Sequence, residues 1–206
     1  MSRYIVTGTD TGIGKTLVAA ALCAHLQATY WKPVQAGTDE ETDSTTVARL
    51  SGLPPAMILP EAYRLATPCS PHEAARLDGV TIDPTRLALP TVDGPLIIEG
   101  AGGVLVPLAS DLLYADMFKR WGLPVILVAR TQLGTINHSL LALEALRARG
   151  IAVHGVLFSG DANLSSEATI CTSGKARHLG RLPLLDKVDA PRLHSAFAAS
   201  VRTDLL

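Results

Sequence analysis

The sequence predicts an α/β domain built on a doubly wound, mainly parallel β-sheet with helices on both faces. Short apolar runs of strand length alternate with helical patterns, which is typical of βαβ units. Two runs, 96–99 and 125–129, are rich in Leu, Ile and Val, as expected for central strands covered on both faces. The chain has 206 residues, 48% apolar and 18% charged, which suits a single well-buried domain over residues 1–206.

Six strands and five helices follow from these patterns. The strands are expected at Tyr4–Thr7, Thr29–Lys32, Leu96–Glu99, Val125–Ala129, Val153–Phe158 and Leu179–Leu182. The helices are expected at Lys15–Gln27, Ser44–Leu50, Asp111–Trp121, Ile136–Arg149 and Pro191–Val201. The segments Gly52–Asp93 and Gly160–Arg177 are rich in Pro, Gly and Ser, and their structure does not follow from the pattern.

Composition and charge limit the kinds of partner and location. The net charge is −1 with scattered Lys and Arg, so we expect no nucleic-acid partner and no membrane partner. The three cysteines, Cys23, Cys69 and Cys171, lie far apart without C-x-x-C spacing, which favours a reducing compartment. A strand-like run begins after three residues, which argues against a signal peptide. We therefore expect a cytoplasmic protein.

The strongest motif follows the first predicted strand, in the segment Gly8-Thr9-Asp10-Thr11-Gly12-Ile13-Gly14-Lys15-Thr16. A glycine-rich turn between a strand and a helix directs backbone N–H groups at phosphate oxygens, and the helix N-terminus adds partial positive charge. Lys15 can reach the β- and γ-phosphates, and the Thr16 hydroxyl can hold Mg²⁺. The sequence thus predicts a P-loop, which in this chain has the spacing G-x5-G-K-T.

Other interpretations of this segment fit less well. A dinucleotide-binding fingerprint needs a third glycine where Leu17 stands. A kinase-type glycine-rich loop lies between antiparallel strands, not before a helix. A glycine-rich hairpin beside an unrelated strand would not explain the Lys-Thr pair at the start of a helix.

Two carboxylates could complete a magnesium site. Glu99 follows the apolar run Leu96–Ile98, at the edge of the sheet where ligands of doubly wound folds gather. A buried carboxylate that caps the next turn is the alternative for Glu99. Asp43 follows the acidic run Asp39–Glu41, and pattern alone allows it to be a solvated surface residue.

A lysine and a helix start supply two further candidates. Lys32 ends the second predicted strand, where its charge could stabilise an anion that develops during a reaction, although an exposed strand-end lysine is the simpler interpretation. The segment Leu133–His138 opens a helix whose free N–H groups could bind a carboxylate, although most helix starts bind nothing. The six histidines show no metal-binding spacing, and the sequence has no nucleophile-elbow motif.

Taken together, these motifs resemble those of the dethiobiotin synthetase family over nearly the whole chain. The matching stretches are Thr7–Thr11 with Gly14–Thr16, Lys32–Val34, Pro68 with Ser70–His72, Glu99–Gly103 with Pro107–Leu108, Pro124–Val128, and Leu133–His138. The P-loop alone is shared by many ATPases, whereas this combination in this order is highly specific.

The resemblance implies an ATP-dependent ligase that acts on 7,8-diaminononanoate and CO₂ or bicarbonate, with Mg²⁺ as cofactor. In that family the substrate forms an N-carbamate, the carbamate oxygen attacks the ATP γ-phosphate, and the second amine closes a cyclic urea. The family also implies a homodimer.

The same resemblance implies a set of site residues. Lys15 and Lys32 are the catalytic pair, and Thr16, Asp43 and Glu99 hold Mg²⁺. The nucleotide contacts fall on Gly12, Ile13, Gly14, Lys15, Thr16, Leu17, Asp43, Glu99, Gly100, Ala101, Gly102, Ser159, Pro183, Leu184 and Leu185. The diaminononanoate contacts fall on Thr11, Lys32, Ala36 and, from a partner subunit, Gly134, Thr135, Ile136 and Asn137.

Three positions depart from the family pattern. Ala36 replaces a common Ser or Thr that bonds the substrate, a loss of about 0.5–1.5 kcal/mol unless Thr38 or water substitutes. Gly12 stands where some members carry Glu, so that acidic role is not transferred. Ser159 aligns with the Asn that reads the adenine edge, which predicts relaxed base selectivity.

A different class of P-loop protein is the main alternative. Switch ATPases of the partition or septum-site type use ATP to dimerise and bind partners, but they carry an extra lysine early in the loop, where this chain has Asp10. Cobyrinate-amidating enzymes are closer relatives, but this chain has no room for their glutaminase domain.

Overall fold

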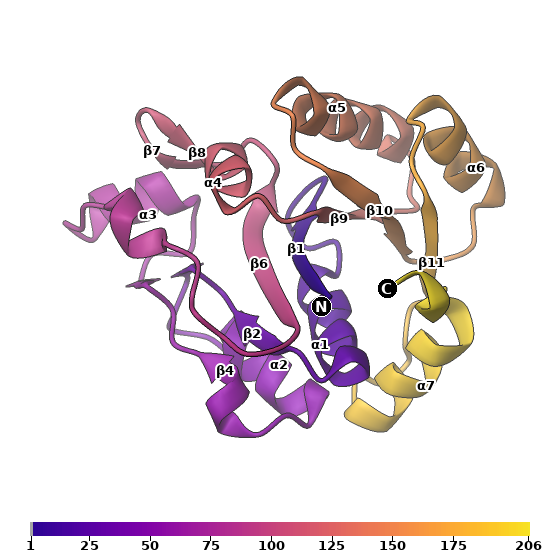
Figure 1. Cartoon of the computed structure of the whole chain (residues 1–206), viewed down its shortest axis with the longest axis horizontal. Coiled ribbons are helices and arrows are strands. Elements are labelled where there is room, and N and C mark those ends of the chain that lie inside the picture. Colours follow the sequence, from indigo (N-terminus) through magenta and orange to yellow (C-terminus); the bar gives the residue numbers. More distant parts are fainter. Residues whose placement is uncertain (1) are drawn as a thin grey trace.

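The computed structural model describes residues 2–206 and contains a seven-stranded sheet in which all paired strands are parallel. The strand order is β11-β10-β9-β1-β6-β2-β4. The bounds of these strands are β1 Arg3–Gly8, β2 Thr29–Trp31, β4 Ile58–Leu59, β6 Leu96–Gly103, β9 Val125–Arg130, β10 Val153–Ser159 and β11 His178–Leu182. The predicted parallel α/β fold is therefore confirmed (Figure 1).

Helices cover both faces of the sheet, with α1, α2 and α7 on one face and α4, α5 and α6 on the other (Figure 1). Their bounds are α1 Lys15–Leu26, α2 Asp43–Ser51, α3 Pro71–Leu77, α4 Tyr114–Trp121, α5 Thr135–Ala148, α6 Leu164–Ser173 and α7 Ala190–Ser200. Short 3₁₀ turns lie at Pro55–Met57, Pro84–Leu87 and Thr203–Leu205.

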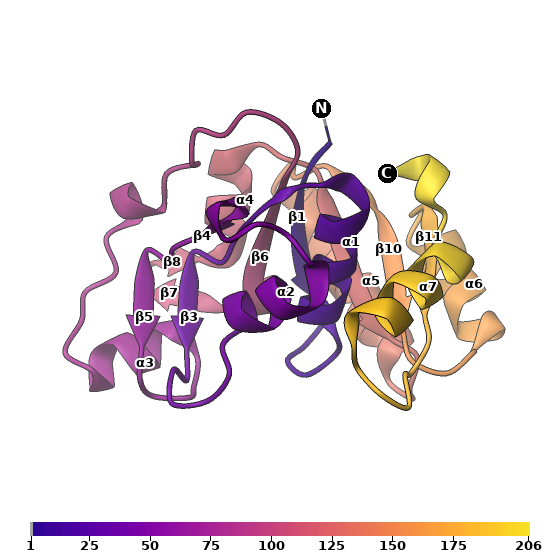
Figure 2. The same ribbon diagram turned by 90° about the horizontal axis from the view of Figure 1, so that it is seen from below.

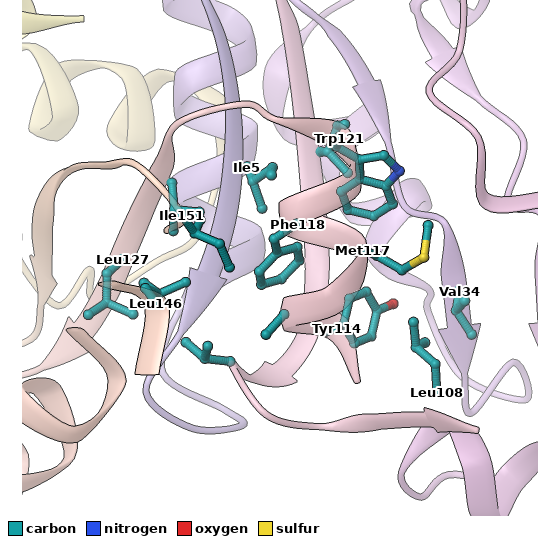
Figure 3. Close-up of a cluster of buried hydrophobic side chains, with 14 of the residues drawn as sticks. Ile5, Val34, Leu108, Tyr114, Met117, Phe118, Trp121, Leu127, Leu146 and Ile151 are labelled. Atoms are coloured by element: carbon teal, nitrogen blue, oxygen red, sulfur yellow. The ribbon is translucent and has the colours of Figure 1, made fainter. Parts of the chain in front are cut away.

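Alternation along the central strands divides the buried side chains between the two faces. On β1, Tyr4 and Val6 join the core beneath α1, whereas Ile5 joins the core beneath α4. Figure 3 shows the second core, where Phe118 and Trp121 of α4 pack towards the sheet and Leu108 lies near Tyr114. Both faces of the sheet are thus buried, which explains why its central strands are rich in apolar residues.

The structure extends or trims several expected elements. Strand β6 continues through Gly103, so Glu99 lies within the strand and does not end it. The expected helix at Asp111 begins only at Tyr114, because Leu112–Leu113 (β8) pairs with Pro107–Ala109 (β7) in an antiparallel hairpin. Strand β2 ends at Trp31, one residue before Lys32.

The segments without an assignment also contain regular structure. Val34–Ala36 (β3) pairs in parallel with Tyr63–Leu65 (β5) beside the main sheet, and α3 follows them in the chain. Helix α6 occupies most of the second unassigned segment. Figure 2 shows β3, β5 and the turn after β1 at the same edge of the molecule, which is the edge where the parallel strands end.

Candidate active site

The phosphate-binding turn connects β1 to α1, and its last glycine requires an unusual backbone. Gly14 caps α1 with φ of 92°, and a Cβ atom there would lie 2.6 Å from the Ser159 hydroxyl. Only glycine satisfies both conditions. The Lys15 ammonium donates to the carbonyl of Asp10 at 2.6 Å, so the lysine folds over the turn that it follows.

Thr16 lies between the two predicted carboxylates. Its hydroxyl is 2.7 Å from Asp43 Oδ1 and 2.9 Å from Glu99 Oε1. The three side chains come from α1, α2 and β6, which meet at the carboxyl edge of the sheet. The fold therefore brings together three hard oxygen donors that are far apart in the sequence.

Lys32 lies against the same carboxylates and is 3% exposed. Its ammonium is 2.6 Å from Asp43 Oδ2, 3.3 Å from Glu99 Oε1 and 2.9 Å from the carbonyl of Gly100. It is therefore not an exposed strand-end lysine. Gly100 leaves little space for a side chain, because a Cβ there would approach the Phe118 ring to 3.1 Å.

Burial and charge shift the ionisation of these groups in different directions. Burial, reinforced by the charge of Lys32, lowers the pKa of Lys15 to about 8. Burial also favours neutral Lys32, but Glu99 and Asp43 outweigh it and raise the pKa of Lys32. Burial raises the pKa of Glu99 against the pull of Lys32, whereas the pKa of Asp43 is lowered, because Lys32 and Thr16 outweigh its burial.

These groups line a cavity of about 550 Å³. Residues 11–17 of the turn and helix start line one side, with Lys32, Asp43 and Glu99 beside them. Ala36, Ala101 and Gly102 also line this cavity, together with the segment Pro68–Pro71. The volume suits a ligand larger than a phosphate group, and the lysines supply positive charge at its centre.

Comparison with known proteins identifies the family. A family profile described as an AAA domain matches residues 2–192. The Novosphingobium aromaticivorans protein named ATP-dependent dethiobiotin synthetase BioD is 59% identical to this chain, over 99% of this chain and 98% of the relative. The proteins of the same name from Rhodopseudomonas palustris strain HaA2 and Bradyrhizobium sp. strain BTAi1 are 62% and 63% identical, each over 97% of this chain and at least 94% of the relative.

The chain belongs to the dethiobiotin synthetase family.

More distant solved structures share the fold of this synthetase. The MinC:MinD cell division protein complex of Aquifex aeolicus matches with a TM-score of 0.53 at 13% identity, over 95% of this chain and 86% of that chain. A ParA family ATPase of Chlorobium tepidum TLS matches with a TM-score of 0.56 at 11% identity, over 99% and 94%. At such identity the likeness concerns the fold alone.

A second cavity of about 410 Å³ adjoins the other side of the phosphate-binding turn of this synthetase. It shares Gly12, Ile13, Gly14 and Leu17 with the first cavity. Ser159, the segment 160–163 and the residues Arg130, Thr131, Gln132 and Leu184 complete its lining. Pro183 and Leu185, which the family pattern also placed near the nucleotide, are partly buried and do not line this cavity.

An asparagine does line the second cavity, but its amide is engaged elsewhere. Asn163 Oδ1 accepts from the N–H of Ser166 at the start of α6, and Nδ2 donates to the carbonyl of Thr131 at 3.2 Å. Asn163 therefore does not replace the base-reading amide that is missing at Ser159. In the first cavity, Thr38 likewise does not replace the hydroxyl that is missing at Ala36, because Thr38 does not line this cavity.

The residues Gly134–Asn137 at the helix start line neither of these two cavities. Gly134 caps α5 with φ of 94°, Thr135 is buried with its hydroxyl bonded to the carbonyl of Arg130, and Asn137 is exposed. The two neighbouring side chains Leu133 and Leu141 are 100% and 57% exposed. This arrangement leaves the first turn of α5 open to another molecule.

Sequence reasoning missed two residues that position the charged groups. The Tyr30 hydroxyl donates to Glu99 Oε2 at 2.9 Å from a fully buried position, and Gln35 Oε1 accepts from the N–H of Asp43 at 3.1 Å. A tyrosine in a strand looks like a core residue in the sequence, and Gln35 lies in a strand too short to be predicted. Only the assembled fold shows that both orient the carboxylates.

The donor set fits a magnesium ion. Thr16, Asp43 and Glu99 present oxygen atoms only, and Mg²⁺ typically binds one or two carboxylates, a hydroxyl and phosphate oxygens. Lys32 contacts both carboxylates in this structure, and the three oxygen donors would hold the ion when it is bound.

Proposed function

We propose that this protein is an ATP-dependent dethiobiotin synthetase that converts 7,8-diaminononanoate and CO₂ into dethiobiotin in biotin biosynthesis. The proposal is supported by relatives of that name, 59–63% identical over at least 97% of this chain. It is supported equally by the chemistry of the first cavity, where a phosphate-binding turn and a buried lysine share one space. The reaction is a ligation that forms carbon–nitrogen bonds and consumes ATP.

The proposed reaction has three steps. One amine of diaminononanoate adds to CO₂ and loses a proton, which gives a carbamate. A carbamate oxygen then attacks the γ-phosphorus, the bond to ADP breaks, and a carbamic-phosphoric anhydride forms. The second amine attacks the carbamoyl carbon, inorganic phosphate leaves, and the ureido ring closes.

The two lysines offset the charge repulsion in the second step. A carbamate and a triphosphate are both anions, so their approach requires cations and backbone dipoles that are already in place. We assign Lys32 to the carbamate side, because it is buried and held by two carboxylates. We assign Lys15 to the γ-phosphate, since it lies at the start of α1 and its ammonium donates to a backbone carbonyl of the phosphate-binding turn.

The remaining assignments follow the cavity walls. The backbone of Gly12–Leu17 and Gly100–Gly102 would surround the phosphates, and Thr11 and Ala36 would contact the diamine. We propose Thr16, Asp43 and Glu99 as the Mg²⁺ ligands, and the ion would neutralise charge on the phosphates. Ser159 and Leu184 would contact the nucleoside in the second cavity.

The single observation that carries this function is the position of Lys32. Its ammonium lines the same cavity as Lys15 and Thr16, while Asp43 and Glu99 fix its place. Hydrolysis of ATP alone does not need a buried second lysine beside the phosphate site. Transfer of the phosphate to an anionic acceptor does.

Substrate-dependent phosphate release tests the function. Phosphate should appear only when ATP, diaminononanoate and bicarbonate are all present, in a one-to-one ratio with dethiobiotin. Phosphate release that depends on DNA or on lipid vesicles, and not on the diamine, would instead support a switch ATPase. The solved structures that resemble this chain share only its fold, so they do not favour that second function.

We also propose a homodimer in which the first turn of α5 serves the partner's cavity. The supporting observations are the open helix start at Gly134–Asn137 and the exposed Leu133 and Leu141 beside it. A helix N-terminus stabilises a carboxylate such as the one on diaminononanoate.

Mixed variants test this dimer. Lys32→Gln and Asn137→Glu chains should each be poorly active alone, but a mixture should regain activity, because one site of each mixed dimer is intact. A mixture no more active than its components would contradict a shared site.

We propose that residues 1–206 form one catalytic domain that acts in the cytoplasm. Across residues 2–206, no helix is both long enough and apolar enough to cross a membrane.

A further inference from the structure

A buried carboxylate outside the charged site organises the far wall of the second cavity. Glu167 of α6 is 3% exposed. Its Oε2 lies 2.9 Å from His178 Nε2, and its Oε1 lies 3.1 Å from Arg181 Nε. His178 Nδ1 accepts from the N–H of Gly180 at 3.1 Å, so Nε2 carries the proton and donates to Glu167. Helix α6 is thus fastened to β11 through one carboxylate.

The same cluster fixes both ends of the segment 160–163. Glu167 Oε1 accepts from the N–H of Asn163 at 3.1 Å, and Arg181 Nη1 donates to the carbonyl of Gly160 at 3.2 Å. Gly160 has φ of 129°, and a Cβ there would lie 2.5 Å from the Thr131 hydroxyl. The backbone of the segment is therefore held at both ends. Glu167 binds Asn163 at the end of the segment, and it contacts Arg181, which binds the carbonyl of Gly160 at the beginning.

This segment lines the second cavity together with the phosphate-binding turn. The lining includes Gly12, Ile13, Gly14 and Leu17 of the turn and helix start, and residues 159–163. Lys15, Lys32, Asp43 and Glu99 line the first cavity and not the second, which assigns the reacting end of the triphosphate to the first cavity. The ribose and base of a bound nucleotide then extend into the second cavity.

We propose that Glu167 is a positioning residue for the nucleoside part of ATP, because it holds the segment 160–163 at a fixed distance from the phosphate-binding turn. The proposal rests on the proposed function, since it takes ATP as the ligand of the turn. Glu167 contacts no reacting atom in this arrangement. Its loss should therefore weaken the recognition of the nucleoside and leave the chemistry of the phosphates unchanged.

The charge of Glu167 is the property to test. Replacement by Gln keeps the size and one oxygen acceptor but leaves the Arg181 guanidinium without its buried counter-charge. Glu61 provides a matched control, because its carboxylate is 5% exposed, pairs with Arg64 at 3.0 Å and lines neither cavity. Glu61→Gln should therefore remove a buried carboxylate from an ion pair, whose arginine is 54% exposed, without moving the cavity wall.

The experiment compares binding of ATP with binding of inorganic tripolyphosphate, which lacks the nucleoside. In Glu167→Gln we expect the Kd for ATP to rise about tenfold, while the Kd for tripolyphosphate and kcat stay within about twofold. The KM for diaminononanoate should also stay unchanged. In Glu61→Gln all four quantities should match the wild type.

Three results would overturn the proposal. The first is an unchanged Kd for ATP in Glu167→Gln, and the second is an equal loss for ATP and tripolyphosphate. The third is a fall in kcat together with a rise in the KM for ATP and in the KM for diaminononanoate, which would indicate general damage to the fold. If Glu167→Gln does not fold, Arg181→Met replaces it, because that side chain is 25% exposed and is the link to Gly160.

The wild type separates this proposal from the proposed function. If wild-type protein makes dethiobiotin but binds ATP no more tightly than tripolyphosphate, the nucleoside makes no useful contact, and only the role of Glu167 fails. If wild-type protein makes no dethiobiotin from ATP, diaminononanoate and bicarbonate, the proposed function itself fails.

Discussion

Lys32 Nζ lies 2.6 Å from Asp43 Oδ2, and this contact joins the end of β2 to the first residue of α2. Glu99 approaches the same ammonium from β6 at 3.3 Å. One cation and two carboxylates are therefore in contact before any ligand is bound. Because Lys32 and Glu99 are almost completely buried, the removal of Lys32 would leave the two carboxylates without their counter-charge.

Replacement of Lys32 by Gln should separate binding from catalysis. We expect turnover to fall by about 10²–10³, the usual cost of one charge-stabilising donor, while ATP binding is largely retained. We also expect the free energy of unfolding to fall by about 3–5 kcal/mol without ligand, because Asp43 and Glu99 lose their counter-charge. Steady-state kinetics and urea unfolding measure the two effects. Turnover like that of the wild type would remove Lys32 from the mechanism.

Two buried tyrosines near these carboxylates should respond differently to removal of the hydroxyl. The Tyr30 hydroxyl donates to Glu99 Oε2, whereas the Tyr114 hydroxyl has no side-chain hydrogen-bond partner within residues 2–206. Tyr30→Phe should lower the free energy of unfolding by about 1.5–3 kcal/mol, since the lost bond is to a charged group. Tyr114→Phe, the matched control, should change it by less than about 0.5 kcal/mol. Equal losses of unfolding free energy in the two variants would contradict this interpretation of the Glu99 site.

Base selectivity should be weak. Ser159 offers no amide to a base edge, and the Asn163 amide is bonded to Thr131 and Ser166. The values of kcat/KM for ATP, CTP and GTP should therefore differ by less than about a hundredfold, because no paired donor and acceptor discriminate the bases. A preference for ATP of a hundredfold or more would show that another group reads adenine.

The acid stability of the protein should depend on His154. Burial, together with the charge of Arg177, lowers the pKa of His154 despite the hydrogen bond of 2.7 Å to the carbonyl of Leu205. An unfolded chain takes up this proton near pH ~6.5, whereas the folded protein does so only at lower pH. Stability from this group is thus complete above that pH and falls as the pH drops towards the folded pKa.

Replacement of His154 by Gln tests this effect. Urea unfolding between pH 5 and pH 8 should show a smaller loss of stability at acid pH in the variant than in the wild type. If the free energy of unfolding fell equally with pH in the two proteins, the acid sensitivity would come from other groups.

The sequence predicts the central part of the fold well. The strands β1, β6, β9 and β10 each contain an apolar run of three or more residues, and such runs arise because both faces of a parallel sheet are covered. The phosphate-binding turn is equally clear, because its glycines and lysine are needed at fixed spacing. Both signals are local in the chain, which makes them readable without the structure.

The peripheral elements and the supporting residues of the site are not local. Strands β3 and β5 have three residues each and exist only because they pair with each other. Glu167 looks like an ordinary acidic residue in a polar helix until β11 places His178 and Arg181 beside it. Such roles depend on contacts between distant segments, and periodicity carries no information about them.

The two ends of the chain lie at the amino edge of the sheet. The carbonyl of Ser2 accepts from the N–H of Leu96 at the beginning of β6, and the ring of Tyr4 lies 4.6 Å from that of His154, which in turn bonds Leu205. Figure 2 shows the start of β1 and the C-terminus on the side opposite the turn after β1. An affinity tag, a fused enzyme or a surface anchor attached at the C-terminus would consequently face away from the phosphate-binding turn.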